Sequence, residues 1–215
     1  MTSNSAIDFA SLLCSRLCHD LLSPVGALNN GLELLADEHD PEMRARCLDL
    51  LNESARASAN KLKFFRLAFG AGGGFGDQID AREAKTAIEG MFAEGGRVEI
   101  GWMVEPATLS KPAMKVLLNL ALIAGDALVR GGRLDIGAEK TANGTEMVVR
   151  ADGPRLILDP ELRQALEGRT AEQEVTPRAA AAFLAAELVR QAQGSIQVSA
   201  PEDPFVMFGA VLKDG

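Results

Sequence analysis

Apolar residues recur every three or four positions through the first forty residues, which is the period of a helix that buries one side. This first series consists of Leu17, Leu21, Val25, Leu28, Leu32 and Leu35. It predicts a helix from near Asp8 to Ala36. A second series has the same period and predicts a helix that ends near Phe69. It consists of Cys47, Leu51, Ala55, Ser58, Leu62, Phe65 and Phe69.

A short polar segment separates the two series. Residues 37–42 contain Asp40, a good N-cap residue, followed by Pro41, which suits the first position of a helix. Because the connection is so short, we expect the two helices to lie antiparallel as a hairpin. Two helices alone cannot cover their apolar sides, so we expect a homodimer in which two hairpins form a four-helix bundle.

Glycine then interrupts all regular patterning. Residues 71–76 read Ala-Gly-Gly-Gly-Phe-Gly and predict a flexible linker. A helix, not a strand, is expected before this stretch, so it does not match a dinucleotide-binding loop. We therefore divide the chain into a helical hairpin at 1–70, a linker at 71–76 and a second domain at 77–215.

The second domain alternates between strand-like and helix-like patterns. The expected strands are 97–104, 133–141, 146–151, 195–199 and 205–212. The expected helices are 80–94, 110–129, 160–167 and 177–193. Asn143-Gly144 predicts a tight hairpin turn. This order favours an α/β sandwich with one mixed sheet covered by helices on one face, and it places the whole chain in the α+β class.

Composition and charge exclude several classes of function. The chain of 215 residues has a net charge of −8 and a pI of about 4.9, which argues against a nucleic-acid partner. No apolar run is long enough to cross a membrane, and the first residues lack the features of a secretory signal. The three cysteines cannot all pair, and no Cys/His cluster has metal-binding spacing. We expect a cytoplasmic protein without a structural metal.

His19 is the candidate reactive residue. It lies opposite the apolar side of the first predicted helix, on a face that it shares with Ser15, Ser23, Gly26 and Asn30 and that Arg16 and Leu22 flank. Asp20 follows it directly. Pro24, five residues on, has no N–H for the carbonyl of Asp20, so we expect a bend just beyond His19. The alternative is an ordinary exposed histidine on a helix surface.

Basic residues of the second helix are expected near His19. Folding the hairpin about its turn brings His19 level with residues 58–62, close to Lys61, Lys63, Phe64 and Arg66. A basic rim would attract an acidic phosphorylated partner. A merely solvated charged face is the alternative for these cations, and a solvated surface acid is the alternative for Asp20.

The His19-Asp20 pair with Pro24 resembles the H-box of histidine kinases, in which the histidine accepts phosphate. A hairpin followed by this order of strands and helices also resembles a kinase core with a Bergerat-type ATP-binding domain. The nucleotide motifs, however, depart from the kinase pattern. Asn119 matches the first asparagine of an N-box, but Ile123 replaces the second and offers no oxygen to a metal ion.

Two further nucleotide motifs are altered. Ala151 stands at the adenine-binding aspartate of the Asp-x-Gly-x-Gly box, and Arg155 at its last glycine. Sliding the alignment to Asp152 puts Pro154 at a glycine position instead. The glycine-rich lid is replaced by the alanine run 179–182, which forms helix readily and cannot cradle phosphates. Together these changes predict that ATP does not bind.

A histidine hairpin joined to a nucleotide-blind, kinase-like domain resembles the ChpT-like histidine phosphotransferases of alphaproteobacterial phosphorelays. Residues 61–71 are similar to the end of that family's second helix. The resemblance implies that the receiver aspartate of a hybrid histidine kinase passes phosphate to His19. His19 then passes it to receiver domains of response regulators, including a cell-cycle transcription factor. Asp20 would orient the ring, and the receiver would supply Mg²⁺, so no cofactor is expected on this chain.

The receiver-binding surface implied by this resemblance is the face around His19. It comprises Arg16, Leu22, Ser23, Gly26, Asn30, Lys61 and Phe64. Two alternatives remain. The chain could be an ATP-dependent sensor kinase with a divergent pocket, or a scaffold that binds receivers without carrying phosphate.

Overall fold

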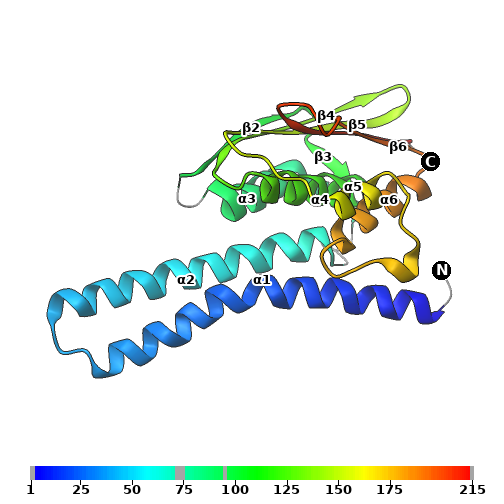
Figure 1. The fold of residues 1–215 in the computed structure, drawn as a ribbon. Helices are drawn as coiled ribbons and strands as arrows, with labels where there is room; N and C mark the ends of the chain where they lie inside the picture. Colours follow the sequence, from blue (N-terminus) through cyan, green and yellow to red (C-terminus); the bar gives the residue numbers. More distant parts are fainter. Residues whose placement is uncertain (1–2, 71–75, 94–95, 214–215) are drawn as a thin grey trace.

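The computed structural model describes residues 3–70, 76–93 and 96–213. A long helical hairpin lies along a layer of helices, and these helices cover one face of a five-stranded sheet (Figure 1). The tip of the hairpin extends beyond the second domain (Figure 1). Apart from Gly76, the predicted linker at 71–76 lies outside the described residues.

The hairpin consists of α1 (Ser3–Asp37) and α2 (Pro41–Ala68). As predicted, Asp40 caps α2: its Oδ2 accepts a hydrogen bond from the backbone N–H of Met43 at 3.0 Å. The first helix begins five residues earlier than the apolar pattern indicated. Gly31 lies against Leu51 so tightly that an added Cβ would be 2.9 Å from its Cδ2 atom. A small residue here lets the two helices approach closely.

The apolar side predicted for α1 is only partly covered: four of its six residues are half-buried, namely Leu17, Leu21, Leu28 and Leu35. Pro24 and Gly31 are buried, whereas Val25 and Leu32 of the predicted seam are 50% and 57% exposed. One chain therefore leaves part of its apolar stripe uncovered, because α2 covers only one side of α1.

The second domain has the predicted mixed sheet. In spatial order its strands are β2 (Val98–Val104), β4 (Gly132–Thr141), β5 (Gly144–Asp152), β7 (Val206–Leu212) and β6 (Ser195–Val198). The β2–β4 pair is parallel, and the other pairs are antiparallel. A small pair of strands, β1 (Gln78–Asp80) and β3 (Thr108–Ser110), was not predicted. Three residues carry too little periodicity to be recognised in a sequence.

The helices on the sheet agree with the predicted order. They are α3 (Ala81–Ile88), continued by a π turn at Glu89–Ala93, then α4 (Lys111–Ala127), α5 (Pro160–Leu166), the 3-10 turn Glu172–Glu174, and α6 (Ala180–Gln191). Side-chain caps start three of the helices, from Asp80, Ser110 and Asp159. The last helix begins three residues after the predicted Pro177.

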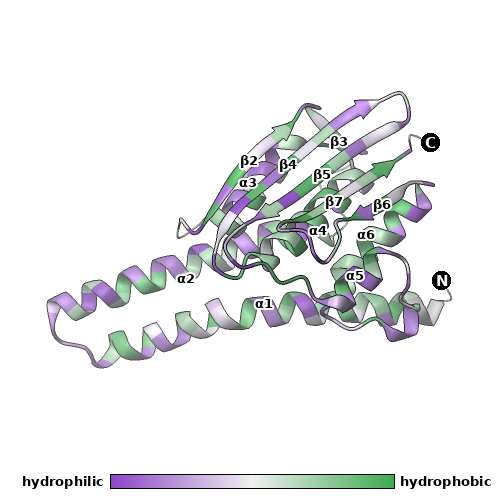
Figure 2. Ribbon diagram, turned by 45° about the horizontal axis from the view of Figure 1, so that its top comes forward, coloured by the Kyte–Doolittle hydropathy of each residue, from purple (hydrophilic) through white to green (hydrophobic). Residues whose placement is uncertain are grey.

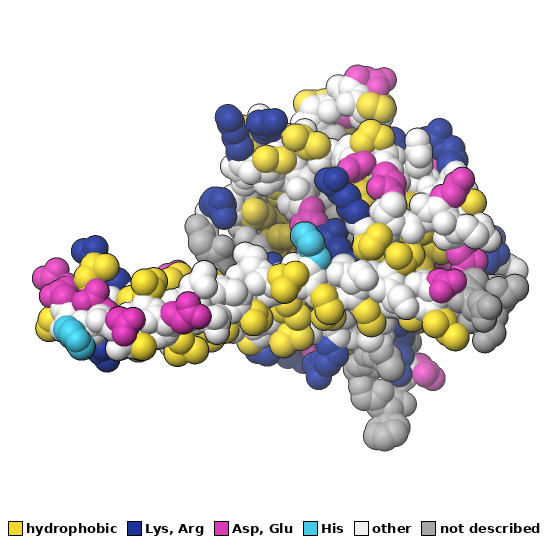
Figure 3. Space-filling view, turned by 60° about the horizontal axis from the view of Figure 1, so that its bottom comes forward, with side chains coloured by type: hydrophobic (Ala, Val, Ile, Leu, Met, Phe, Trp, Pro, Cys, Tyr) yellow, Lys and Arg dark blue, Asp and Glu magenta, His cyan; other side chains and the backbone are white. Residues whose placement is uncertain are grey.

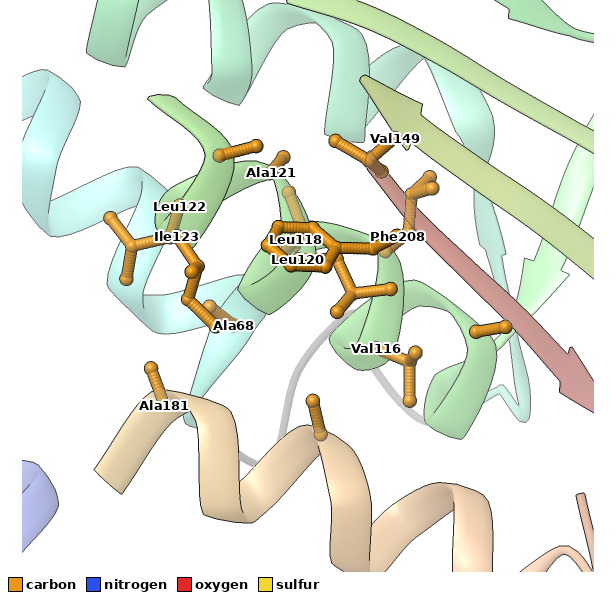
Figure 4. Packing of buried hydrophobic residues seen from close by; sticks show 14 of the residues in the cluster. Ala68, Val116, Leu118, Leu120, Ala121, Leu122, Ile123, Val149, Ala181 and Phe208 are labelled. Carbon is orange, nitrogen blue, oxygen red and sulfur yellow. The ribbon is translucent and has the colours of Figure 1, made fainter. Parts of the chain in front are cut away.

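The centre of the core is α4, which is apolar on nearly all sides and buried along most of its length. Figure 4 shows Val149 and Phe208 of the sheet on one side of this helix and Ala181 of α6 on another. Gly125 leaves room for the ring of Phe92, which would lie 2.4 Å from an added Cβ.

Hydrophilic and hydrophobic residues are mixed along the strands of the sheet (Figure 2). Along β7, Val206, Phe208, Ala210 and Leu212 are buried, while Met207 between them is exposed. This alternation is typical of a sheet with helices on one face only.

Candidate functional site

His19 lies midway along α1, with its side chain 83% exposed. Its Nδ1 atom is 3.1 Å from Oδ1 of Asp20, within hydrogen-bonding distance. The carboxylate therefore selects the form of the ring that carries a proton on Nδ1, which leaves the Nε2 lone pair directed away from Asp20.

Arg16 binds the carboxylate of Asp20 through the oxygen that does not face His19. The carboxylate is only 13% exposed, and its Oδ2 accepts a hydrogen bond from Nε of Arg16 at 2.9 Å. The same guanidinium donates from Nη2 to Oδ2 of Asp126, near the end of α4, at 2.7 Å. One arginine thus joins the carboxylate beside His19 to the second domain.

The charges of this cluster depend on one another. Burial by itself would lower the pKa of Arg16, but the charges of Asp126 and Asp20 outweigh it, so the pKa lies above its usual value. Burial raises the pKa of Asp126 above its usual value, and the charge of Arg16 offsets only part of that shift. Arg16 therefore stays charged at any physiological pH and favours the ionised form of Asp126.

Pro24 leaves a backbone acceptor free beside His19, and α2 supplies the donor. The carbonyl of Asp20 would normally accept from the N–H four residues on, which proline lacks. Nζ of Lys61 donates to this carbonyl oxygen at 2.8 Å. The prediction that Lys61 lies level with His19 is confirmed, but its ammonium group is already engaged with the hairpin backbone.

The small and apolar residues predicted around His19 form one open face. Ser23 and Asn30 are exposed, Leu22 is 71% exposed, and nothing lies within 4 Å of a Cβ built on Gly26. A partner could approach the imidazole across this face without displacing a side chain from the core.

Other members of the predicted surface lie elsewhere. Phe64 is completely buried against Phe65 and Phe92, so the prediction that it contacts a receiver is wrong. Lys63 and Arg66 line a hollow of about 340 Å³ against α3 and do not border His19. These errors share one cause. These side chains of α2 face the second domain, and the apolar pattern of the hairpin does not predict where that domain packs. Arg16 is 15% exposed and forms ion pairs with Asp20 and Asp126, so its charge is not available to a partner protein.

The positions that match nucleotide motifs are part of the core. Ile123 is 3% exposed and Ala151 is fully buried. The alanine run 179–182 is buried as well, and α6 packs against α4 (Figure 4). Asn119 is fully buried, and its Nδ2 donates to the carbonyl of Ala68 at 3.2 Å and of Lys115 at 2.8 Å. The retained asparagine thus ties α4 to the end of α2.

Asp126 is the residue of this charged cluster that the sequence reasoning missed. It lies 110 residues from Arg16, so no local pattern connects them. One signal was present: Asp126 is the only charged residue between Val116 and Ala127, in the last turn of an apolar helix. Negative charge is unfavourable at that end of a helix, which indicates that it has a cationic partner.

Comparison with known proteins decides the family. The model of the histidine phosphotransferase C-terminal domain matches residues 81–204. This chain belongs to the histidine phosphotransferase family. It is 34% identical over 202 residues to protein phosphotransferase ChpT of Brucella abortus (strain 2308), covering 94% of this chain and 95% of that protein.

A solved phosphotransferase structure agrees with the assignment. A bacterial phosphotransferase structure at 1.7 Å has 33% identity and a TM-score of 0.82, covering 95% of this chain and 96% of the other. A mycobacterial sensor histidine kinase, MprB, has 18% identity and a TM-score of 0.47, covering 63% of this chain and 95% of the other.

The predicted resemblance to ChpT-like proteins is therefore confirmed, as is the α+β fold of a helical hairpin followed by a domain with a mixed sheet. This histidine phosphotransferase acts in phosphotransfer of the two-component, phosphorelay type. Among the described residues, no helix is both long and apolar enough to span a membrane.

Proposed function

We propose that this histidine phosphotransferase relays a phosphoryl group through His19, from the receiver aspartate of a hybrid histidine kinase to the receivers of response regulators. The observation that supports this is the imidazole of His19: it is 83% exposed, and its Nδ1 atom lies beside Asp20, so Nε2 is directed away from that carboxylate. Because a cell-cycle transcription factor is implied by the resemblance to ChpT-like proteins, it belongs to the proposed acceptors.

The chemistry follows from this geometry. The Nε2 lone pair attacks the phosphorus of the receiver's aspartyl phosphate in line, an N–P bond forms, and the bond to the carboxylate oxygen breaks. The carboxylate leaves with the electron pair. Positive charge develops on the ring, and the carboxylate of Asp20 beside Nδ1 stabilises it. In donation, a second receiver aspartate attacks the same phosphorus and Nε2 leaves.

The receiver supplies the remaining charge stabilisation. Within the described ranges, no three His, Cys, Asp or Glu side chains gather in a metal-binding arrangement. When bound in the receiver, Mg²⁺ neutralises the phosphoryl oxygens during transfer. The face formed by Leu22, Ser23, Gly26 and Asn30 leaves room for such a partner to approach.

Transfer of label tests the proposal. A receiver domain carrying radiolabelled aspartyl phosphate should label this protein, and the purified labelled protein should then label a second receiver. Absence of transfer, with receivers that still bind, would instead support the scaffold alternative, in which the protein docks receivers without carrying phosphate.

Gly26→Trp is expected to block receivers while leaving His19 chemically intact. Gly26 lies two turns from His19 on the same face, and its open surroundings let an indole project outward without disturbing the core. Label transfer should therefore fall at least about tenfold, a loss of about 1.4 kcal/mol in binding. Gly26→Ala is the matched control; it adds one methyl group to the helix and should transfer normally. Normal transfer by Gly26→Trp would place receiver docking elsewhere.

We expect ATP not to stabilise the protein, with or without Mg²⁺, because core side chains fill the positions of the nucleotide motifs. A ligand at 100 times its Kd would raise the unfolding free energy by about 2.7 kcal/mol. Thermal unfolding with millimolar ATP measures this, with an active sensor kinase as the positive control. A comparable upshift here would favour the divergent-kinase alternative.

A homodimer through the hairpin is also part of the proposal. Apolar side chains that one chain leaves exposed gather along the hairpin (Figure 3). They include Val25 and Leu32 on α1 and Leu48 and Leu62 on α2, each roughly half exposed. Exposed apolar stripes on a helical pair indicate a protein partner, and a second hairpin has the matching stripe.

A further inference from the structure

A continuous chain of hydrogen bonds joins the second domain to His19. Asp126 of α4 accepts from Arg16, Arg16 donates to Asp20, and Asp20 lies 3.1 Å from Nδ1 of His19. Asp20 and Asp126 are 106 residues apart in the sequence, and the planar guanidinium of Arg16 binds both carboxylates. Such a fork fixes the relative position of its two acceptors in a way that a single-point contact cannot.

We infer that Arg16 and Asp126 are positioning residues for phosphoryl transfer: the end of α4 holds Arg16, and Arg16 orients the Asp20 carboxylate that sets the tautomer and direction of His19. The inference rests on the proposed role of His19. It also gives the second domain a role in the transfer, because its helix α4 fixes the orientation of His19 through Asp126 and Arg16.

The placement of Asp126 favours this role over a simple surface ion pair. Its negative charge is in the last turn of α4, where the helix dipole disfavours it. Arg16 and Asp20 are 15% and 13% exposed, so solvent screens their contact poorly. Asp126 is 43% exposed, but its partner Arg16 is largely buried.

A second contact also joins α4 to the hairpin. Asn119, seven residues before Asp126 and so on the same face of α4, donates to the carbonyl of Ala68 at the end of α2. One face of α4 thus holds both helices of the hairpin: Asn119 contacts α2, and Asp126 contacts α1. Domain and hairpin are held at two points, which keeps the orientation of Arg16 constant while receivers come and go.

Asp126→Asn tests the inference, since it preserves shape and removes the charge. Under single-turnover conditions with a phosphorylated receiver, we expect the maximal transfer rate to fall about tenfold, as expected for a misaligned reactive group. The receiver concentration at half-maximal rate should stay the same, because the docking face is unchanged. Glu99→Gln is the control: Glu99 forms an ion pair with Arg133 at 3.0 Å on the sheet, in a more exposed setting and away from His19. It should transfer at the wild-type rate.

Two readouts separate positioning from general loss of structure. First, ¹⁵N NMR of the His19 ring should show the Nδ1–H form in the wild type and a mixture of tautomers in Asp126→Asn. Second, Asp126→Asn should have no additional effect in an Asp20→Asn background, because the carboxylate through which it acts is already gone. An unchanged tautomer, or a rate loss that persists in that background, would overturn the inference.

Arg16→Lys provides an independent variant if Asp126→Asn does not fold. An ammonium group retains the charge but cannot hold two carboxylates in a fixed fork, so the same loss of rate and of tautomer is expected. Wild-type rate and tautomer in Arg16→Lys would contradict the inference. His19→Ala is measured alongside. If His19→Ala is inactive while Asp126→Asn and Arg16→Lys transfer normally, only the positioning role fails; if His19→Ala is still labelled, the proposed function fails.

Discussion

Replacing His19 with alanine will abolish both receipt and donation of phosphate, because no other side chain in the proposed mechanism forms the N–P bond. The ring is 83% exposed and contributes little to packing, so the unfolding free energy should change by no more than about 0.5 kcal/mol. Radiolabel from a phosphorylated receiver measures the first effect, and thermal unfolding with light scattering measures the second.

The other histidine supplies the matched control for this experiment. His39 is exposed in the turn before α2, twenty residues from His19, which corresponds to about 30 Å along a helix. His39→Ala should transfer phosphate as the wild type does. Continued labelling of the His19→Ala protein would show that a different residue accepts the phosphoryl group, and the mechanism through Asp20 and Arg16 would lose its basis.

Replacing Leu32 with aspartate is expected to convert the proposed dimer to monomers. Leu32 is 57% exposed in one chain, so a charge there is tolerated by the monomer. In a four-helix bundle the same position would be desolvated, and an unpaired buried charge costs several kcal/mol. Since about 1.4 kcal/mol weakens association tenfold, the dimer should dissociate at micromolar concentration. Light scattering measures the change in mass.

A charge introduced elsewhere tests whether the effect belongs to the hairpin. Val148 is 48% exposed on the outer face of the sheet, so Val148→Asp adds the same charge to a comparable site. It should leave the mass unchanged. A monomeric wild-type protein at micromolar concentration would contradict the proposed dimer, and the exposed stripe of α1 would then need another partner.

Much of the candidate site could be read from local spacing. The exposure of His19 follows from its angle to the leucine series, and its contact with Asp20 joins neighbouring residues. The missing N–H of Pro24 left an acceptor on Asp20 that had to be satisfied, yet nothing local identified Lys61 as its donor. The helical period of the apolar residues showed which residues share a face of a helix. It did not show which face packs against the other helix and which against the second domain.

The sequence by itself determined the hairpin, the presence of a mixed sheet, the exposed His19 with Asp20 beside it and the loss of the nucleotide motifs. Each of these depends on local periodicity, capping or side-chain chemistry. Only the tertiary structure decided that Phe64 is buried, that Val25 and Leu32 are left uncovered, and that Arg16 joins Asp20 to Asp126. These features depend on how α2 and α4 are placed against α1. That placement is set by packing over the whole core, where contacts between residues distant in the chain outweigh local preference.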